Sequence, residues 1–302
     1  MNVIGFDTSN YTTSIARFDG VDGVNCSRLL PVKPGELGLR QSDAVFSHTK
    51  SLPELSGRLF SDLRQISAVG VSTRPRAVEG SYMPCFMVGY SHAKLLSDAL
   101  QVPLFEVSHQ QGHVAACLWS AGRLDLMDQP HLAWHLSGGT TELLLVEPEG
   151  KNVKCTKIGG TTDISAGQLI DRTGVMLDLP FPAGKHVDLL SKEAVNTDLF
   201  KVKCPGLEFS LSGVQNKVQQ YAETNRPAET AAYALRGVCY AVQAATRNAQ
   251  KAYPGLEVVF SGGVASNSML RAVMKEAIFS EPAYSTDNAM GVAVLAHRLL
   301  EG

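Results

Sequence analysis

The chain has 302 residues, of which 44% are hydrophobic and 19% are charged, and its formal net charge is −2. This length and composition predict a soluble globular protein of one large domain or two packed lobes. A slightly acidic balance excludes whole-molecule attraction to a phosphate backbone or an anionic membrane. Any contact with nucleic acid therefore needs a local basic patch or a partner.

The cysteines and the N-terminus indicate a compartment. None of the six cysteines forms a C-x-x-C pair or lies at zinc-finger spacing, which favours a reduced, cytoplasmic location. The first residues lack the basic region of a signal peptide. No uninterrupted apolar run approaches the roughly 18 residues of a membrane span. We expect no membrane association.

Two similar hairpins are predicted along the chain. Residues 3–6 read as a buried strand, a polar turn follows with Asp7, Thr8 and Ser9, and residues 12–18 resume a strand. Near mid-chain, residues 131–136 and 142–146 repeat this strand–turn–strand pattern around a second turn, which consists of Ser137, Gly138, Gly139, Thr140 and Thr141. Hydroxyls and backbone N–H groups in such turns can donate to a phosphate. The repetition suggests a duplicated α/β architecture.

Helices are predicted between and after these hairpins. Residues 88–100 and 112–121 have helical patterns, and residues 165–190 and 214–251 are mostly helical, interrupted at Gly174, Pro180 and Pro182. Residues 31–38 read as a surface loop.

Two histidines four residues apart, His109 and His113, are the strongest candidates for chemistry. On a helix they project from one face, so both imidazoles can reach one metal ion. The alternative is a pair of half-buried histidines on an amphipathic helix. Asp287 precedes the predicted last helix, residues 291–300, and reads either as a helix cap or as a third ligand. Two histidines and a carboxylate suit Fe²⁺, with Zn²⁺ as the alternative.

A third glycine site follows the predicted strand 258–260. Gly262 and Gly263 stand between that strand and a predicted helix over residues 269–277, where backbone amides favour an anionic or nucleotide ligand. Asp171 and Asp188 could accept from hydroxyls of a ligand, in the way that acids hold a ribose. Ordinary solvated acids on helices are the alternative for both.

Eight segments, taken in order, resemble the motifs of one family. They span nearly the whole chain: residues 5–9 (G-F-D-T-S), 109–113 (H-Q-Q-G-H), 137–141 (S-G-G-T-T), 166–171 (A-G-Q-L-I-D), 181–184 (F-P-A-G), 209–213 (F-S-L-S-G), 262–267 (G-G-V-A-S-N) and 286–288 (T-D-N). The sequence resembles the TsaD/Gcp family of tRNA N6-adenosine threonylcarbamoyltransferases, once described as O-sialoglycoprotein endopeptidases.

The resemblance implies a fold, a site and a reaction. The fold would be an α/β, actin-like ASKHA fold with two RNase-H-like lobes, residues 1–125 and 126–302, and a helical insertion at about 163–250. His109, His113 and Asp287 would hold the metal. The adenylate ligand, ATP, AMP or threonylcarbamoyl-AMP, would be bound by residues from several segments: Ser137, Gly138, Gly139, Thr140, Thr141, Asp171, Gly184, Asp188 and Asn267.

In this family a threonylcarbamoyl group passes from an adenylate to N6 of adenosine-37 in tRNA. The resemblance therefore implies tRNA and the family's partner proteins as partners, and it leaves a homodimer open. Some positions depart from the family pattern: Asn10, Tyr11 and Thr12 replace Cys-Asp-Glu, Thr140 replaces a histidine, and residues 73–80 replace a glycine-rich stretch.

These departures keep alternatives open. The chain could be a nucleotide-binding regulatory subunit, or it could transfer a carbamoyl group to an acceptor other than tRNA. A sugar-kinase-like enzyme of the same fold is a third alternative, but that class lacks a paired-histidine site. A metallopeptidase is disfavoured because Gln110 stands where a glutamate base would be needed.

Overall fold

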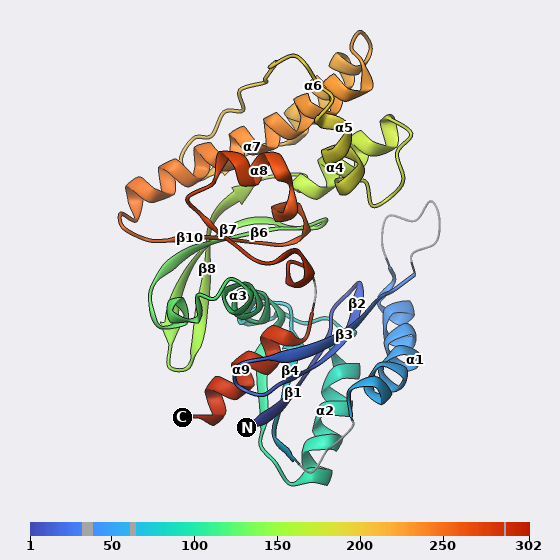
Figure 1. Cartoon of the computed structure of the whole chain (residues 1–302), viewed down its shortest axis with the longest axis vertical. Helices are drawn as coiled ribbons and strands as arrows, with labels where there is room; N and C mark the ends of the chain where they lie inside the picture. Colours follow the sequence, from blue (N-terminus) through green and yellow to red (C-terminus); the bar gives the residue numbers. More distant parts are fainter. Residues whose placement is uncertain (32–38, 61–64, 287) are drawn as a thin grey trace. The chain divides into compact units, whose positions relative to one another are not determined.

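The computed structural model describes residues 1–31, 39–60, 65–286 and 288–302 (Figure 1). It divides into two compact units, one of residues 1–129, 147–155 and 287–302, the other of residues 130–146 and 156–286. The predicted lobes were consecutive segments that meet at residue 125. In the structure, by contrast, the last helix of the chain and residues 147–155 belong to the first unit.

A five-stranded sheet forms the centre of the first unit, within the described residues, with the strand order β3-β2-β1-β4-β5. The strands are β1 (Asn2–Thr8), β2 (Thr12–Phe18), β3 (Gly23–Leu29), β4 (Ile66–Arg74) and β5 (Leu104–Ser108). β1, β4 and β5 are parallel, whereas β2 pairs antiparallel with both β1 and β3. The carboxyl ends of three parallel strands therefore lie at one edge of the sheet.

Helices cover both faces of this sheet (Figure 1). They are α1 (Gln41–Leu59), α2 (Phe86–Leu100), α3 (His109–Ser120) and α9 (Met290–Leu300), with the short η2 (Leu124–Asp128) after α3. Ile4 and Phe6 of β1 belong to the same apolar cluster as residues of α1 and α2. Gly5, between them, faces α9, and a Cβ there would lie 2.7 Å from the Ala293 nitrogen. β1 is thus buried on both sides, as its apolar run predicts.

A second close approach joins α3 to α9. A Cβ on Gly291 would overlap the carbonyl oxygen of Gly112, and a Cβ on Gly112 would lie 3.2 Å from Val292 Cγ2. Glycine at both positions lets the two helix backbones meet. Gly112 lies between His109 and His113, so this crossing fixes the helix that carries both histidines.

In the second unit, the described residues form a six-stranded sheet in the order β11-β10-β6-β7-β8-β9. The strands are β6 (His131–Leu136), β7 (Thr141–Glu149), β8 (Asn152–Thr161), β9 (Glu208–Phe209), β10 (Val258–Ser261) and β11 (Ile278–Phe279). β10 runs parallel to both β6 and β11, and β6 pairs antiparallel with β7.

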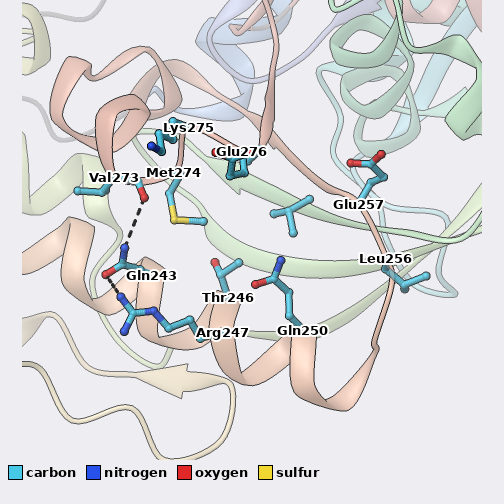
Figure 2. Close-up of a pocket in the computed structure, with 12 residues that line it drawn as sticks. Gln243, Thr246, Arg247, Gln250, Leu256, Glu257, Val273, Met274, Lys275 and Glu276 are labelled. Atoms are coloured by element: carbon cyan, nitrogen blue, oxygen red, sulfur yellow. Dashed lines mark hydrogen bonds between the residues drawn. The ribbon is translucent and has the colours of Figure 1, made fainter.

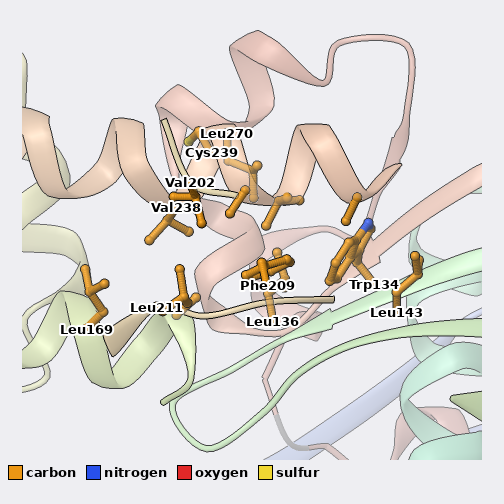
Figure 3. Close-up of a cluster of buried hydrophobic side chains, with 14 of the residues drawn as sticks. Trp134, Leu136, Leu143, Leu169, Val202, Phe209, Leu211, Val238, Cys239 and Leu270 are labelled. Atoms are coloured by element: carbon orange, nitrogen blue, oxygen red, sulfur yellow. The ribbon is translucent and has the colours of Figure 1, made fainter. Parts of the chain in front are cut away.

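The core of this unit lies between one face of the sheet and the long helix α7 (Pro227–Ala252) (Figure 3). Trp134 and Leu136 of β6 point into it, and the Trp134 indole N–H donates to Thr246 Oγ1 of α7 at 2.9 Å. His131, Ala133 and His135 alternate with these residues and face the other side of the sheet. The remaining helices are α4 (Ala166–Met176), α5 (Gly184–Ser191), α6 (Ser212–Ala222), α7 (Pro227–Ala252), η3 (Gly263–Ser266), α8 (Ser268–Val273) and η4 (Pro282–Tyr284).

Two helix predictions need correction. Gly174 does not interrupt a helix, because it lies inside α4, where a Cβ would overlap that of Ala183. Its role is to let α4 pack against the residue before α5. The predicted helix over residues 269–277 is shorter, since α8 ends at Val273.

The predicted surface loop lies outside the described residues from residue 32 onward. Among the helices that the structure describes, none combines the length and the apolar content that crossing a bilayer requires.

Candidate functional site

The start of α3 is fixed by a reciprocal cap. Ser108, the last residue of β5, accepts a hydrogen bond from the Gln111 amide at 3.2 Å, and Gln111 Oε1 accepts from the Ser108 amide at 2.9 Å. This capping box satisfies two backbone donors that would otherwise lack partners. The helix therefore begins at His109, and His113 follows one turn later on the same face.

The two imidazoles converge. His109 Nε2 and His113 Nε2 are 3.0 Å apart, with ring centroids at 4.4 Å and near-perpendicular planes. Zn–N bonds are about 2.0–2.1 Å long, so one ion can contact both nitrogens across this separation. His113 is 6% exposed and His109 is half-buried. The pair fits the predicted metal in donor type and spacing.

Asp7 orients one of these rings. Its carboxylate oxygens lie 3.0 and 3.1 Å from His109 Nδ1, and Ser72 donates a further hydrogen bond to Asp7 Oδ1. Asp7 is fully buried at the carboxyl end of β1. Since a carboxylate accepts from Nδ1–H, a neutral His109 keeps its lone pair on Nε2, toward His113. A carboxylate behind a histidine ligand is a common feature of metal sites.

Thr8 and Ser9 hold the turn that follows Asp7. Thr8 Oγ1 donates to the Cys85 carbonyl at 2.9 Å and accepts from the Gly89 amide at 3.1 Å. The Ser9 carbonyl accepts from His48 Nε2 at 2.8 Å. Burial lowers the pKa of His48, so this ring stays neutral and can donate from one nitrogen only. Thr8 and Ser9 thus anchor the turn, and their role in ligand binding stays a prediction.

The third predicted metal ligand, Asp287, lies outside the described residues. Within the described ranges, no group of three histidine, cysteine or acidic side chains is arranged to hold a metal ion. The described chain brings together His109 and His113, and the carboxylate that would complete the set stays a prediction.

In the second unit, the two glycine turns follow neighbouring parallel strands. β6 leads into the turn at Ser137, and β10, paired with β6 so that Ser261 lies opposite His135, leads into Gly262. Ligands of open α/β sheets bind outside the carboxyl ends of such strands. The turn is closed by hydrogen bonds from the Ser137 amide to the Thr140 carbonyl at 2.8 Å and from the Thr140 amide to Ser137 Oγ at 3.1 Å.

The glycines around these turns have different roles. A Cβ on Gly138 or Gly139 would have no neighbour within 4 Å, so both backbones are open to a ligand. By contrast, a Cβ on Gly167 would lie 2.5 Å from the Ser137 oxygen, and one on Gly262 would overlap the Leu136 oxygen. The first pair leaves room, and the second pair permits close packing.

The start of α4 is attached to the first turn by side chains. Ser165 Oγ donates to the Gly138 carbonyl at 2.6 Å, and Thr141 Oγ1 accepts from the Ala166 amide at 2.8 Å. Thr141, predicted to contact the adenylate, is 2% exposed. It therefore fixes the turn, whereas the exposed backbone of the glycines remains available.

Asp171 lies on α4 and reaches the start of α5. Its Oδ1 accepts from the Ala183 amide at 2.8 Å, and burial raises its pKa. Gly184 follows at the first position of α5, and a Cβ there would meet nothing within 4 Å. The predicted pair Asp171 and Gly184 is thus brought together, with open space at the glycine.

Asp188 and Asn267 are also neighbours. Asp188 Oδ1 accepts from Asn267 Nδ2 at 2.8 Å, from the Ser268 amide at 3.1 Å and from Ser268 Oγ at 2.9 Å. Asn267 in turn caps α8 by accepting from the Leu270 amide at 3.0 Å. Two predicted ligand residues that are 79 positions apart therefore meet beside the second glycine turn.

Asp163 is an organising residue that the sequence pattern did not assign. Its carboxylate accepts from Ser210 Oγ at 2.5 Å, from Ser212 Oγ at 2.6 Å and from the Leu211 amide at 2.8 Å. Burial opposes its charged form, but these hydrogen bonds outweigh that effect and lower the pKa of Asp163 to about 2. Ser210, just before α6, and Ser212, its first residue, were the available signal, since the hydroxyls and first amides of a helix start need an acceptor.

A separate cavity of about 320 Å³ lies at the other end of β10 (Figure 2). It is lined by one face of α7, including Thr246 and Arg247, by Glu257 just before β10, and by Met274 and Lys275. β10 runs from this cavity to the glycine turn. None of the predicted site residues lines it.

Known structures share this fold. Full-length HypF, in a phosphate- and nucleotide-bound form, aligns with a TM-score of 0.65 at 14% identity over all of this chain and 47% of HypF. Component A of the (R)-2-hydroxyglutaryl-CoA dehydratase of Acidaminococcus fermentans aligns with a TM-score of 0.60 at 11% identity over the full length of both chains. A putative N-acetylmannosamine kinase of Listeria monocytogenes has a TM-score of 0.52. The predicted α/β ASKHA fold is confirmed.

Sequence comparisons identify the family. The protein from Carboxydothermus hydrogenoformans named tRNA N6-adenosine threonylcarbamoyltransferase is 34% identical over 79% of this chain and 73% of its own length. The protein of the same name from Halalkalibacterium halodurans is 30% identical over 78% of this chain and 70% of its own. The family model described as "TsaD: tRNA N6-adenosine threonylcarbamoyltransferase" matches residues 41–294. The chain therefore belongs to the TsaD family, which is named for an acyltransferase activity.

Proposed function

We propose that this protein transfers a threonylcarbamoyl group from an adenylate to N6 of adenosine-37 in tRNA, with a divalent metal held by His109, His113 and Asp287. The observation that carries the proposal is the convergence of two histidine nitrogens at 3.0 Å, backed by a buried carboxylate, in a chain of the TsaD family.

The metal part of the proposal is supported by the hydrogen bonds around His109. Asp7 and Ser72 fix the ring and leave Nε2 as the acceptor, which is the protonation state that a metal ligand needs. We propose Fe²⁺, with Zn²⁺ as the alternative. When bound, the ion would supply Lewis acidity toward the acyl phosphate and neutralise charge on the leaving AMP.

The adenylate part is supported by the turns of the second unit. Open backbone at Gly138, Gly139 and Gly184 allows close approach of a phosphate or a ribose, and backbone amides can stabilise developing charge. Asp171 and Asp188 offer carboxylate oxygens for ribose hydroxyls, as acids do in other nucleotide sites.

The chemistry assigned to the chain is positioning and charge stabilisation. The N6 amine attacks the carbamoyl carbon, the bond from that carbon to the phosphate oxygen breaks, and AMP leaves. A tRNA acceptor, the family's partner proteins, a possible homodimer and a cytoplasmic location all remain parts of the proposal. A regulatory subunit and a carbamoyltransferase with another acceptor are the competing outcomes.

Metal content tests the paired histidines first. Elemental analysis of protein purified without added metal should find close to one ion per chain in the wild type and almost none in His109→Ala. His92→Ala is the matched control, because His92 is a half-buried histidine of α2 whose Nδ1 donates to the Val88 carbonyl of its own helix at 2.8 Å. Equal metal in His109→Ala and the wild type would exclude the site.

Transfer is tested with the purified full chain, threonylcarbamoyl-adenylate and unmodified tRNA, followed by mass spectrometry of the nucleosides. We expect modified adenosine with the wild type and none with His109→Ala. If metal and AMP bind but no modified adenosine forms, even with the family's partner proteins added, the tRNA acceptor is wrong and one of the competing functions holds.

A further inference from the structure

Two segments of the first unit depart from the TsaD family pattern and have no role in the proposed function. Residues 10–12 lie in the turn between β1 and β2, and residues 73–80 begin in the last two residues of β4. β1 and β4 are parallel neighbours, so both segments stand at the edge of the sheet where Asp7 contacts His109. Two of the places where this chain differs from the family therefore lie beside the paired histidines.

Tyr11 lies in a turn that two neighbouring segments hold. Its carbonyl accepts a hydrogen bond from the Leu30 amide at 2.7 Å, and Asn10 Oδ1 accepts one at 2.5 Å from Gln41 Nε2 at the start of α1. The Tyr11 side chain is nevertheless 39% exposed. Within the described part of the chain, no ring contact or hydrogen bond engages this side chain. A fixed backbone that carries an exposed ring is a stacking surface with little conformational freedom left to lose.

Arg74 lies beside the first histidine of the pair. It is the last residue of β4, and its Cα pairs in register with Ser108, which precedes His109. The carbonyl of the next residue, Pro75, accepts from the Gln110 amide at 3.0 Å, so the chain after β4 is bonded to the first turn of α3. The Arg74 side chain is exposed, and among the described residues its guanidinium has no hydrogen-bond or ion-pair partner. A cation that can bind an anionic group thus stands next to the proposed metal site.

The two side chains suit one kind of ligand. Proteins hold unpaired nucleotides by stacking bases on aromatic rings and by binding phosphates with arginine. An aromatic ring stacks on any base, so such a site recognises an unpaired nucleotide rather than a sequence. In the proposed transfer the metal contacts the acyl phosphate, and the attacking amine must reach the carbon bonded to that phosphate. The base that carries the amine therefore lies near His109 and His113, at the edge where Tyr11 and Arg74 stand.

We propose that Tyr11 and Arg74 hold the acceptor nucleotide of the RNA. The Tyr11 ring stacks on the base that carries the attacking amine, and Arg74 binds a phosphate next to it. The inference rests on the proposed function, because it needs an RNA acceptor. Neither residue is among those assigned to the adenylate. Both are therefore specificity residues for the acceptor, and their loss leaves the binding of the metal and of AMP intact.

Stacking is tested at Tyr11 with the metal-loaded full chain and unmodified tRNA. In Tyr11→Leu the KM for tRNA should rise by about 5–150-fold, which is the effect of removing one base–aromatic stack, whereas kcat should change less. Tyr11→Phe keeps the ring and should keep the wild-type KM. Phe46→Leu is the matched control, because Phe46 is a 65% exposed aromatic side chain on α1 of the same unit.

A fluorescent base reports the stack directly. A tRNA with 2-aminopurine in place of the acceptor adenosine should lose fluorescence when it binds the wild type or Tyr11→Phe, because stacking quenches this base. With Tyr11→Leu, at protein concentrations that bind all of the tRNA, this quenching should be absent. The metal content and AMP affinity of Tyr11→Leu should equal those of the wild type, which separates a lost stack from a damaged site.

The phosphate contact is tested by salt. Each phosphate contact to a single strand contributes about −0.7 to the slope of log K against log[salt], so Arg74→Gln should make the slope shallower by that amount. Tyr11→Leu should weaken binding without changing the slope. Arg58→Gln is the matched control, because Arg58 is an exposed arginine in the last turn of α1, roughly 25 Å along the helix from Gln41.

The outcomes separate this inference from the proposed function. Wild-type KM and quenching in Tyr11→Leu, in a protein that modifies tRNA, would overturn the stacking assignment and leave the proposed function standing. An unchanged salt slope in Arg74→Gln would exclude the phosphate contact. If Tyr11→Leu also loses metal or AMP, its role is structural and the inference is wrong. If the wild type transfers the group only to an acceptor other than RNA, or to none, the proposed function fails and this inference fails with it.

Discussion

The two candidate sites differ in how much of each is in place before a ligand binds. In the first unit, the buried residues Asp7 and Ser72 and the half-buried His109 form a chain of hydrogen bonds, so the polar atoms are held in place before any ligand arrives. In the second unit, Gly138, Gly139 and Gly184 leave open space beside exposed backbone. The first arrangement is preorganised for a small cation, and the second leaves room for a larger, anionic ligand.

The difference shows where each site can tolerate change. Glycine next to a ligand is needed for space that the free protein does not fill, whereas glycine in a packed turn is needed for the fold itself. Side chains that orient a metal ligand are in turn needed for affinity rather than for the fold. Substitutions of packed glycines, of side chains that orient a metal ligand and of open glycines should therefore affect different properties. We expect them to lower stability, metal affinity and nucleotide affinity, respectively.

The largest effect is expected at Gly262. Its φ of 91° and ψ of 158° fall in a region that is essentially restricted to glycine, and a Cβ would overlap the Leu136 oxygen. Gly262→Ala should lose about 1–3 kcal/mol from the backbone alone, plus the cost of the overlap. A protein domain of this size loses about 2–4 °C in Tm for each kcal/mol, which calorimetry would measure.

Gly139→Ala is the control for that variant. Since a Cβ at Gly139 meets nothing within 4 Å, its Tm should stay close to that of the wild type. Its AMP affinity should nevertheless fall, because the added methyl occupies the space left for the ligand. A Gly139→Ala protein that binds AMP as the wild type does would show that the open turn is not the nucleotide site.

A smaller effect is expected at Asp7. Asp7→Asn keeps the shape but replaces an acceptor-only carboxylate by an amide that can present N–H to His109 Nδ1, which permits the wrong tautomer. Loss of such a supporting group typically lowers metal affinity by about 10–100-fold. Competition with a fluorescent chelator would measure it, with Asp19→Asn, on an exposed turn of the same unit, as the matched control. Unchanged affinity would remove Asp7 from the site.

Local patterns predicted much of this fold. β2 and β6 have the predicted bounds, and β1 extends its prediction by a few residues, because short runs of apolar, β-branched and aromatic residues beside polar turns are typical of strands. β3 was not predicted, since its residues are mostly half-exposed and its position depends on pairing with β2. Gly174 was misjudged because a packed glycine and a helix-breaking glycine look alike without the neighbour, here Ala183.

Within the candidate site, the sequence gives candidate residues but not the contacts between them. The spacing of His109 and His113 gave their common face, but the contact of Asp7 with His109 joins residues 102 positions apart. Likewise, nothing in the spacing of Asp188 and Asn267 predicts that they are bonded to each other. Such contacts depend on the sheet order, which brings the ends of β1 and β5 to one edge.

The smallest effect is expected at Asp163, and its sign follows from the direction of its pKa shift. Its pKa is about 2 in the folded protein and 3.8 in the reference state, so the charged carboxylate stabilises the fold above pH 3.8. That contribution is lost as the pH falls from about 4 to about 2. Asp163→Asn should therefore be less stable than the wild type at pH 7, by an amount that screening by solvent keeps modest. Denaturant unfolding at several pH values should show the two proteins converging below pH 4. A difference in stability that stays constant across that range would mean that the negative charge of Asp163 does not stabilise the start of α6. The packing and neutral hydrogen bonds of the side chain would then be sufficient.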